Sequence, residues 1–416
     1  MHALTSYEFS IFLFTIGTML ILARLLSKVG AVFSIPTLVA ELLAGIMLGP
    51  TILGMLYPQA YSFFFPIEGN LPNAYATIFD LSVVMLLFIA GVDLDLNLLT
   101  KKKKAVVITS LFGVILPFAL AFVFAWQYFD FLHGIEISAA PFIFPLIFAT
   151  LISVSSLPII SRILMSYNIT NTDIGITILG VAIVSDLIGW FSYSSIMVYA
   201  NASVENTQIL YTLFYLIGFF VVIFFISGQK KLMGMLFSEK ASSAHEHSYD
   251  LAMLFGICLL TAAFTSAIHI HASLGAFIAG IVCRRIIGDD NPILKQIELF
   301  IINFFAPIFF ISIGLKIDFI KNFNFWMVIV VFLFACSIKL IGAYIGTRLS
   351  GIKSKPASAI ATCLTTQGTL GVIMGALALK AGLIGSQLFV AVVITSIGTS
   401  LLVEVAVIKI LNLNKA

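Results

Sequence analysis

The stretch ILGVAIVSDLIGW, residues 178–190, is an apolar run that carries one carboxylate, Asp186, near its centre. Placing an aspartate in the middle of a membrane helix costs about 2.5 to 3.5 kcal/mol, so such acids usually face a cavity or a partner and mark ion or proton pathways. A charge of opposite sign, Lys339, lies inside another apolar run, FACSIKLIGAYIG (334–346). These two charges are the first candidates for a functional site.

The composition identifies the class of the protein. Of its 416 residues 61% are hydrophobic and only 10% charged, and the mean hydropathy is +1.13. Apolar runs of about 20 residues, the length that crosses a bilayer core, recur along the chain. We therefore predict an all-α polytopic membrane protein with about thirteen transmembrane helices. The expected spans are 8–26, 33–53, 75–98, 105–128, 142–165, 174–200, 209–227, 250–268, 272–288, 296–315, 324–348, 357–380 and 387–411.

The connections between these spans leave no room for a soluble domain. The longest polar connection, residues 228–250, is typical of a linker. The sequence contains no P-loop, no Cys or His metal cluster and no nucleophile elbow, so we expect neither an enzyme nor a cofactor. The run KKKK (101–104) is typical of a topology anchor rather than a nucleic-acid site. Function must lie within the spans, with the lipid bilayer as surroundings.

Lysine and arginine residues are distributed unevenly between the two sides of the predicted helices. Short loops rich in these residues favour the cytoplasmic side. With the N-terminus outside, eighteen of the 22 basic residues fall inside, and only Lys316, Lys321 and Lys380 fall outside. The remaining basic residue is Lys339, which lies within an expected span. We expect an outside N-terminus and a cytoplasmic C-terminus, and no cleaved signal peptide because a basic n-region is lacking.

The order of the spans predicts an inverted repeat, because six spans, one linker and six spans would place the second six in the opposite orientation. The fifth span of each half, 142–165 and 357–380, is interrupted by polar or helix-breaking residues. These are Ser153, Ser155, Ser156 and Pro158 in the first, and Thr365, Thr366, Gln367, Gly368 and Gly371 in the second. Unwound backbone is tolerated in a membrane where it lines a cavity, although a plain kink would show the same residues.

Both intramembrane charges share their helix face with small or polar residues. Ala182, Ser185, Gly189 and Ser192 flank Asp186, and Ala335, Cys336, Gly342, Ala343 and Gly346 flank Lys339. Both side chains should therefore face protein or water and not lipid. The structural alternative is a buried Asp–Lys pair that only maintains packing, although such pairs are poor stabilisers.

Seven segments in this order resemble the monovalent cation:proton antiporter-2 family, nearly from end to end. They are IPTLVAELLAGIMLGPTILG (35–54), LLFIAGVDLDL (86–96), SVSSLPIISRIL (153–164), GITILGVAIVSDLIG (175–189), HASLGAFIAGIV (271–282), APIFFISIGLKID (306–318) and IKLIGAYIGTRLSG (338–351). The resemblance implies that the fifth and twelfth spans cross as partly unwound helices. It further implies that Asp186 matches the ion-binding carboxylate and Lys339 the basic residue of the eleventh span.

The resemblance also implies a homodimer in which a mobile core moves against a fixed panel. Residues 1–104 would form panel and dimerisation helices, and residues 105–200 the first half of the core. Residues 201–323 would supply a linker helix and further panel helices, and residues 324–416 the second half of the core. The expected location is the inner, or plasma, membrane.

Two departures from the family pattern affect the expected mechanism. Many sodium-transporting relatives carry Asp-Asp where this chain has Ser185-Asp186, and the missing acid is the one that pairs with the lysine. Lys339 therefore either pairs with Asp186 or remains without a carboxylate partner. Potassium-efflux relatives tend to have Gly-Glu where this chain has Gly368-Thr369. A cytosolic nucleotide-binding domain is not expected.

The expected function is exchange of a monovalent cation for protons, with Na⁺ favoured over K⁺ or Li⁺. Asp186 would hold either a proton or a cation, assisted by the hydroxyls of Ser185, Ser155 and Ser156 and by freed backbone carbonyls. Lys339 would compensate charge. A K⁺/H⁺ exchanger without its regulator is the nearest alternative, and a channel-like or sensory membrane module a more distant one.

Overall fold

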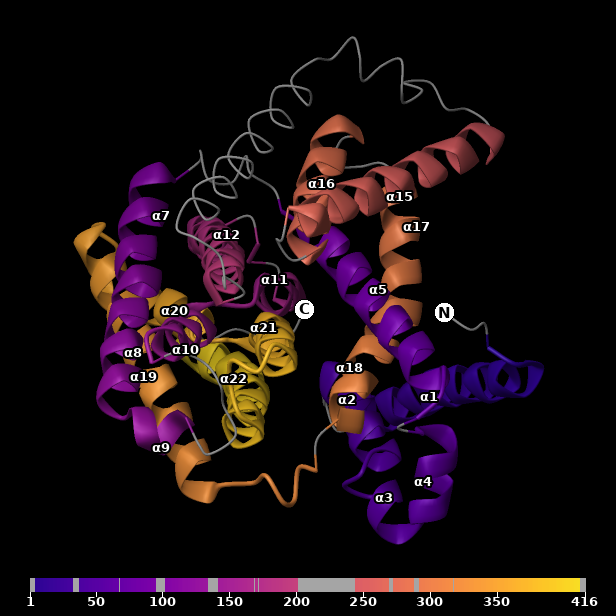
Figure 1. Cartoon of the computed structure of the whole chain (residues 1–416). Helices are drawn as coiled ribbons and strands as arrows, with labels where there is room; N and C mark the ends of the chain where they lie inside the picture. The colour runs from indigo at the N-terminus through magenta and orange to yellow at the C-terminus, as the bar shows by residue number, and fades with distance from the viewer. Residues whose placement is uncertain are drawn as a thin grey trace. The chain divides into compact units, whose positions relative to one another are not determined.

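Helices are the regular elements throughout the part of the chain that the structure describes (Figure 1). The computed structural model describes residues 4–32, 37–66, 68–94, 102–133, 141–167, 169–170, 172–200, 244–268, 272–287, 292–316 and 318–411. Nine helical stretches among these residues are long and apolar enough to cross a membrane. They are Ser6–Val32, Thr37–Leu56, Leu71–Val92, Lys103–Gln127, Asp173–Met197, Leu294–Leu315, Phe325–Leu349, Ser354–Lys380 and Ser386–Leu411. The predicted all-α membrane fold is confirmed.

The expected spans differ from the observed helices in detail. The fifth span is split into α10 (Ile143–Ser153) and α11 (Leu157–Ser166). The eighth begins at Ala244, in α15 (Ala244–Ala267), so the end of the expected 228–250 linker is helical. The expected seventh span, 209–227, lies outside the described residues.

The chain divides into two compact units, each built from two separate segments. Unit 1 comprises Met1–Leu94 and Asn201–Ile320, and unit 2 comprises Asp95–Ala200 and Lys321–Ala416. Each unit therefore combines one segment from the first half of the chain with one from the second.

Unit 1 is organised around two pairs of helices that meet through glycines. Its helices are α1 (Ser6–Val32), α2 (Thr37–Leu48), α3 (Leu53–Leu56), α4 (Pro58–Phe64), α5 (Leu71–Val92), α15, α16 (Ala272–Ile287), α17 (Pro292–Phe300), η2 (Ile301–Phe305) and α18 (Ala306–Lys316). Gly45 of α2 lies against Gly314 of α18, and Gly91 of α5 against Gly280 of α16. A Cβ at any of these four positions would collide with the backbone of the facing helix. The sequence Ala-Gly-Ile surrounds both Gly45 and Gly280, so the two contacts are built alike.

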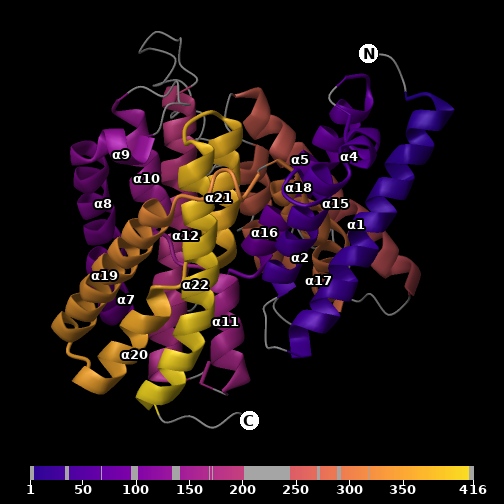
Figure 2. The same cartoon turned by 90° about the horizontal axis from the view of Figure 1, so that it is seen from below.

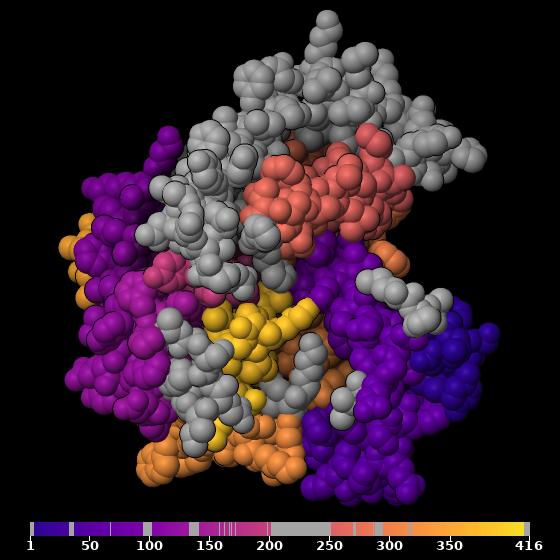
Figure 3. Space-filling view, viewed as in Figure 1, coloured from indigo at the N-terminus to yellow at the C-terminus, as the bar shows by residue number. Residues whose placement is uncertain are grey.

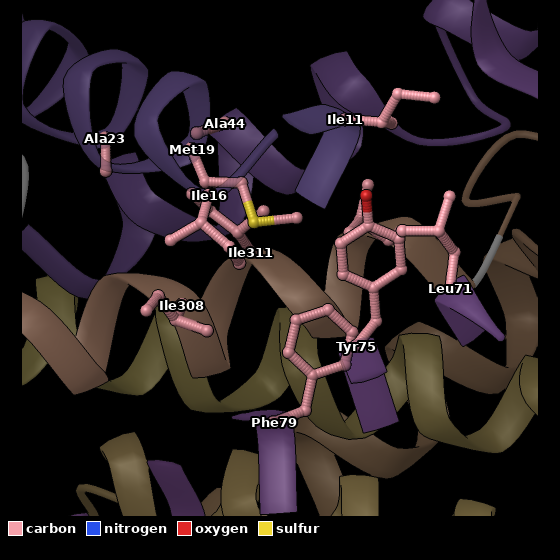
Figure 4. Close-up of a cluster of buried hydrophobic side chains, with 11 residues drawn as sticks. Ile11, Ile16, Met19, Ala23, Ala44, Leu71, Tyr75, Phe79, Ile308 and Ile311 are labelled. Atoms are coloured by element: carbon pink, nitrogen blue, oxygen red, sulfur yellow. The ribbon is translucent and has the colours of Figure 1, made fainter. Parts of the chain in front are cut away.

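An apolar cluster joins α1, α2, α5 and α18 within unit 1 (Figure 4). Met19 of α1 and Ile308 of α18 are fully buried in it. Tyr75 of α5 stacks on Phe79 with ring centroids 6.1 Å apart, and its hydroxyl donates to the Phe64 carbonyl at 3.0 Å. The polar end of this buried tyrosine is thus satisfied. On another part of the same unit α15 packs against α16, and both are drawn in salmon in Figure 3.

Unit 2 contains all the interrupted helices predicted from the sequence. Its elements are α7 (Lys103–Ser110), η1 (Leu111–Ile115), α8 (Leu116–Gln127), α9 (Phe129–His133), α10, α11, α12 (Asp173–Ala200), α19 (Phe325–Leu349), α20 (Ser354–Leu364), α21 (Gly368–Lys380) and α22 (Ser386–Leu411). Helix α19 packs against α7, η1, α20 and α22, and Figure 2 shows α21 and α22 side by side in yellow. An ion pair of 2.8 Å between Lys102 and Asp173 joins the starts of α7 and α12.

Among the described residues, each unit contains one π-helical turn, and a proline lies two residues after its last residue. Pro117 follows η1 in unit 2, and Pro307 follows η2 in unit 1. Proline has no N–H and its ring clashes with the carbonyl four residues earlier in a regular α-helix. A wider π turn at that point accommodates the proline without breaking the helix.

Candidate functional site

Two helices of unit 2 are unwound at the places where the sequence predicts interruptions. Between α10 and α11 the chain is extended, with φ, ψ of −69°, 151° at Val154 and −85°, 104° at Ser156. Pro158 follows in the first turn of α11, where a missing N–H has no cost. Between α20 and α21 the break covers residues 365–367, and Gly368 begins α21 with a φ of +51°.

The two breaks are hydrogen-bonded to each other. The Ser156 N–H donates to the Thr366 carbonyl at 2.9 Å, and the Ser155 hydroxyl donates to the Leu364 carbonyl at 2.6 Å. The Gln367 side-chain amide donates to the Ile152 carbonyl at 3.3 Å. Backbone groups freed by one break are thus partly satisfied by the other, as the membrane interior requires. The predicted crossing of discontinuous helices is confirmed.

Glycine at position 368 permits this close approach. Its positive φ favours glycine, and a Cβ there would lie 2.6 Å from both Cβ and Oγ of Ser156. The Ser156 hydroxyl is 3.2 Å from that of Thr369 in the first turn of α21. The Gly368-Thr369 pair therefore completes the crossing with a neutral hydroxyl contact.

Helix α12 lies directly beside the first break. The Ser155 N–H donates to the Ser185 hydroxyl oxygen at 2.8 Å, so Ser185 fixes the unwound segment against α12. Asp186, the next residue, is only 3% exposed. Its Oδ1 has no hydrogen-bond partner among the described residues. A buried carboxylate in this condition is costly unless it takes up a proton or a cation.

Lys339 of α19 is fully buried, and its ammonium group donates to the carbonyl oxygen of Val154. Val154 caps the C-terminal end of α10, where the helix dipole is negative and a positive charge is stabilising. Within the described residues no ion pair joins Lys339 to Asp186. The two charges nevertheless interact electrostatically. The structure thus shows a lysine that binds a backbone carbonyl directly and acts on the Asp186 carboxylate without direct contact.

The remaining predicted residues have more local contacts. The Ser153 hydroxyl donates to the Thr150 carbonyl at 3.2 Å, and the Thr365 hydroxyl donates to the Thr362 carbonyl at 2.6 Å. Both bonds stay within their own helices and satisfy carbonyls near the helix ends. The Thr366 hydroxyl is buried and without a partner among the residues described.

Some groups that build the site were not found by sequence reasoning. The Val154 and Leu364 carbonyls are backbone groups, and no residue type signals them in advance. The Thr399 hydroxyl of α22 accepts a hydrogen bond from the Gln367 N–H at 3.3 Å. Because the chain has many serines and threonines, the sequence does not indicate that this one contacts the break. Only a spacing argument between α21 and α22 could have suggested it.

The described part of the chain contains no cluster of side chains typical of a transition-metal or multi-carboxylate site. No group of three or more His, Cys, Asp or Glu side chains comes together there. The polar groups at and beside the two breaks are instead one carboxylate, several hydroxyls and backbone carbonyls, all of them oxygen groups of the kind that hard cations prefer.

The chain resembles known cation/proton antiporters along nearly its whole length. The family described as "Sodium/hydrogen exchanger, transmembrane" matches residues 12–413. The Na(+)/H(+) antiporter NhaS4 of Synechocystis is 27% identical over 394 residues, covering 94% of each chain. The Na(+)/H(+)-K(+) antiporter GerN of Bacillus cereus is 26% identical over 395 residues, again 94% of each. The sodium proton antiporter MjNhaP1 from Methanocaldococcus jannaschii shares the fold, with a TM-score of 0.67 over 96% of both chains at 17% identity.

Proposed function

The chain belongs to the sodium/hydrogen exchanger family and is a cation/proton antiporter, not an enzyme, and from this premise we propose that Asp186 carries the proton and the cation in turn. The observation that supports the assignment is the buried Oδ1 of Asp186 without a hydrogen-bond partner among the described residues. Either a proton or a monovalent cation would neutralise it, and the two would compete for the same oxygen. Competition at a single carboxylate enforces exchange.

Serine hydroxyls next to Asp186 would complete the cation's ligand shell. Ser185 accepts one hydrogen bond from the Ser155 N–H, and a hydroxyl oxygen has a second lone pair for a cation. The Ser155 hydroxyl donates a hydrogen bond to the Leu364 carbonyl, and its oxygen accepts none from the described residues, so its lone pairs can coordinate a cation. Ser156 is a further candidate at the crossing. We propose these three hydroxyls, with Asp186, as the cation ligands.

Lys339 would act as a fixed compensating charge. Its ammonium group satisfies the end of α10 through the Val154 carbonyl, so it stabilises the unwound segment and remains close to the proposed site. With one carboxylate exchanging one proton for one monovalent cation, each half-cycle moves the same charge. We therefore propose electroneutral exchange, in which a membrane potential does not drive transport.

The division into units suggests which part moves. Both breaks and Asp186 belong to unit 2, whereas unit 1 is joined by close glycine contacts and an apolar cluster. We propose that unit 2, which overlaps the expected core segments 105–200 and 324–416, is the mobile core of an alternating-access cycle. Unit 1, which overlaps the expected panel segments 1–104 and 201–323, would be the fixed panel and the surface of a homodimer.

The proposed setting is the plasma membrane, with the N-terminus outside and the C-terminus in the cytoplasm. The uneven distribution of lysine and arginine supports this orientation. The two similar glycine contacts of unit 1, each with an Ala-Gly-Ile segment, support an inverted repeat. In the plasma membrane the protein would contribute to the pH and sodium balance of the cell.

Na⁺ is the proposed cation, since the relative from Synechocystis is described as a Na(+)/H(+) antiporter. K⁺ is the second candidate, because the relative from Bacillus cereus is described as exchanging both. A channel or sensor is disfavoured by membership of an antiporter family.

The test is proton movement in proteoliposomes that contain a pH dye, with sodium or potassium pulses. The wild type should give a cation-evoked pH change, and Asp186→Asn should reduce it to the level of empty liposomes while still inserting and folding. An Asp186→Asn protein with full exchange would contradict the assignment of Asp186.

A further inference from the structure

A second set of buried polar groups lies where α21 begins. Gln367, Ser396 and Thr399, which we call the Gln367 cluster, are 0, 0 and 2% exposed. Gln367 directly precedes α21, and the other two residues lie on one face of α22. The Thr399 hydroxyl accepts the Gln367 N–H at 3.3 Å and donates to the Ser396 carbonyl at 3.2 Å. The three residues thus form one connected group.

Two oxygens of the Gln367 cluster have no hydrogen-bond partner among the described residues. They are Oε1 of Gln367 and Oγ of Ser396. Both lie close to one point on α21, because a Cβ on Gly371 would be 2.9 Å from Ser396 Oγ and 3.9 Å from Gln367 Oε1. The Oγ1 of Thr395, next to Ser396, is likewise buried and unpartnered in the described part of the chain. Buried polar atoms of native proteins are nearly always paired, so these oxygens call for a bound water or ion.

The cluster repeats the arrangement around Asp186 with one difference. In the first break the Ser155 N–H donates to the Ser185 hydroxyl on α12, the long helix that follows α11. In the second break the Gln367 N–H donates to the Thr399 hydroxyl on α22, the long helix that follows α21. A carboxylate accompanies the first contact, and only amide and hydroxyl oxygens accompany the second.

Neutral oxygens at an unwound helix can bind a monovalent cation without any acid. In transporters with discontinuous helices, freed carbonyls and the C-terminal ends of half-helices coordinate Na⁺. Helix α20 ends at Leu364, three residues before Gln367, so a negative helix end precedes the cluster in the chain. A hard monovalent cation fits these oxygen ligands better than an anion or an apolar molecule.

We propose that the Gln367 cluster is a second, charge-neutral binding position for the transported monovalent cation. This proposal rests on the proposed function and adds a position to it. A cation held by Gln367 Oε1 and Ser396 Oγ exchanges part of its water for protein oxygens before or after it occupies Asp186. Because neutral ligands compensate a large dehydration cost poorly, the cluster binds the weakly hydrated K⁺ and Rb⁺ at least as well as Na⁺.

The test is equilibrium binding of radioactive sodium and rubidium to purified protein, with Asp186→Asn to remove the carboxylate. Saturable rubidium binding should remain in Asp186→Asn. It should be lost when Gly371→Ala is added, because the new Cβ displaces the Ser396 hydroxyl. Ser396→Ala in the same background should also remove it, and serves if Gly371→Ala fails to fold.

Gly375→Ala is the matched control for crowding of α21. It lies one turn from Gly371, but its Cβ would meet the Phe389 ring at 3.2 Å and Val392 Cγ1 at 3.5 Å. Binding should survive this change. Absence of residual sodium and rubidium binding in Asp186→Asn would overturn the second position and mean that the cluster holds only water. Proteoliposome exchange by the wild type would still stand in that case, so the two proposals fail separately.

Discussion

Units 1 and 2 both bring paired membrane helices into close contact, but by opposite means. In unit 1 the contacts Gly45–Gly314 and Gly91–Gly280 let whole helices touch backbone to backbone. In unit 2 the helices are interrupted, and the Ser156 N–H of one break bonds the Thr366 carbonyl of the other. Glycine contacts give close, apolar packing, whereas broken helices supply polar groups inside the membrane. The difference is thus between a unit that packs its helices through glycines and a unit that places polar backbone groups inside the membrane.

The largest expected contrast is between the buried acids of the two units. Asp186 in unit 2 and Glu41 in unit 1 are 3% and 5% exposed. We expect Asp186→Asn to abolish exchange and Glu41→Gln to keep it within about twofold of wild type, because only Asp186 adjoins a helix break. Both are measured as cation-evoked pH change per reconstituted protein. Equal losses in the two variants would mean that function is not confined to unit 2.

A glycine contact of unit 1 should be sensitive to a single methyl group. Gly91→Ala places a Cβ against the Phe277 carbonyl, and overpacking of this kind costs about 1–3 kcal/mol. We expect a lower thermal midpoint and less folded protein, with exchange per folded molecule preserved. Gly17→Ala in α1 is the control, since nothing lies within 4 Å of its added Cβ. If Gly91→Ala unfolds like wild type, the glycine contact does not hold unit 1 together.

Removal of one hydroxyl should test how unit 2 supports its unwound backbone. Ser185→Ala leaves the buried Ser155 N–H without its acceptor, which costs about 1–3 kcal/mol. The apparent affinity for the cation should also fall, since Ser185 is a proposed ligand. Ser195→Ala on the same helix is the control, because the Ser195 hydroxyl bonds only the Phe191 carbonyl of its own helix. Identical cation affinity in Ser185→Ala would remove Ser185 from the ligand set.

The smallest effect on stability is expected at Lys339. Lys339→Met loses the bond to the Val154 carbonyl but also removes a desolvated charge, so the two terms offset each other to within about 1 kcal/mol. The pH dependence of exchange should nevertheless move, because a fixed positive charge near the site is gone. Lys339→Arg retains the charge and should keep a profile closer to wild type. An unchanged profile in Lys339→Met would reduce this residue to a packing role.

The sequence predicted the class, the two breaks and both buried charges, because each has a direct signal. Long apolar runs identify membrane helices, and Pro158, Gly368 and the clustered hydroxyls identify interrupted ones. The same signals did not give the partner of Lys339. That partner is the Val154 carbonyl, and every residue has a carbonyl, so side-chain patterns carry no information about which one is used.

The glycine contacts that pack unit 1 could not be predicted from the sequence either. Gly45, Gly91, Gly280 and Gly314 are ordinary residues of apolar runs, and their pairing depends on how α2, α5, α16 and α18 cross in space. The π turns before Pro117 and Pro307 are similar, since a proline in a membrane helix indicates an irregularity but not its kind. The start of α15 at Ala244 shows that a polar segment can extend a membrane helix beyond its apolar part.

The hydrogen bonds between the two breaks have a consequence for the direction of transport. The hydrogen bond between Ser156 and Thr366 joins the two pairs of half-helices. We therefore expect them to move together, so that the oxygens around Asp186 keep their spacing whichever side of the membrane they face. A cation would then meet the same ligands on entry and on exit. Such an exchanger has no preferred direction of its own, and runs forward or backward according to the concentrations of cation and proton on the two sides.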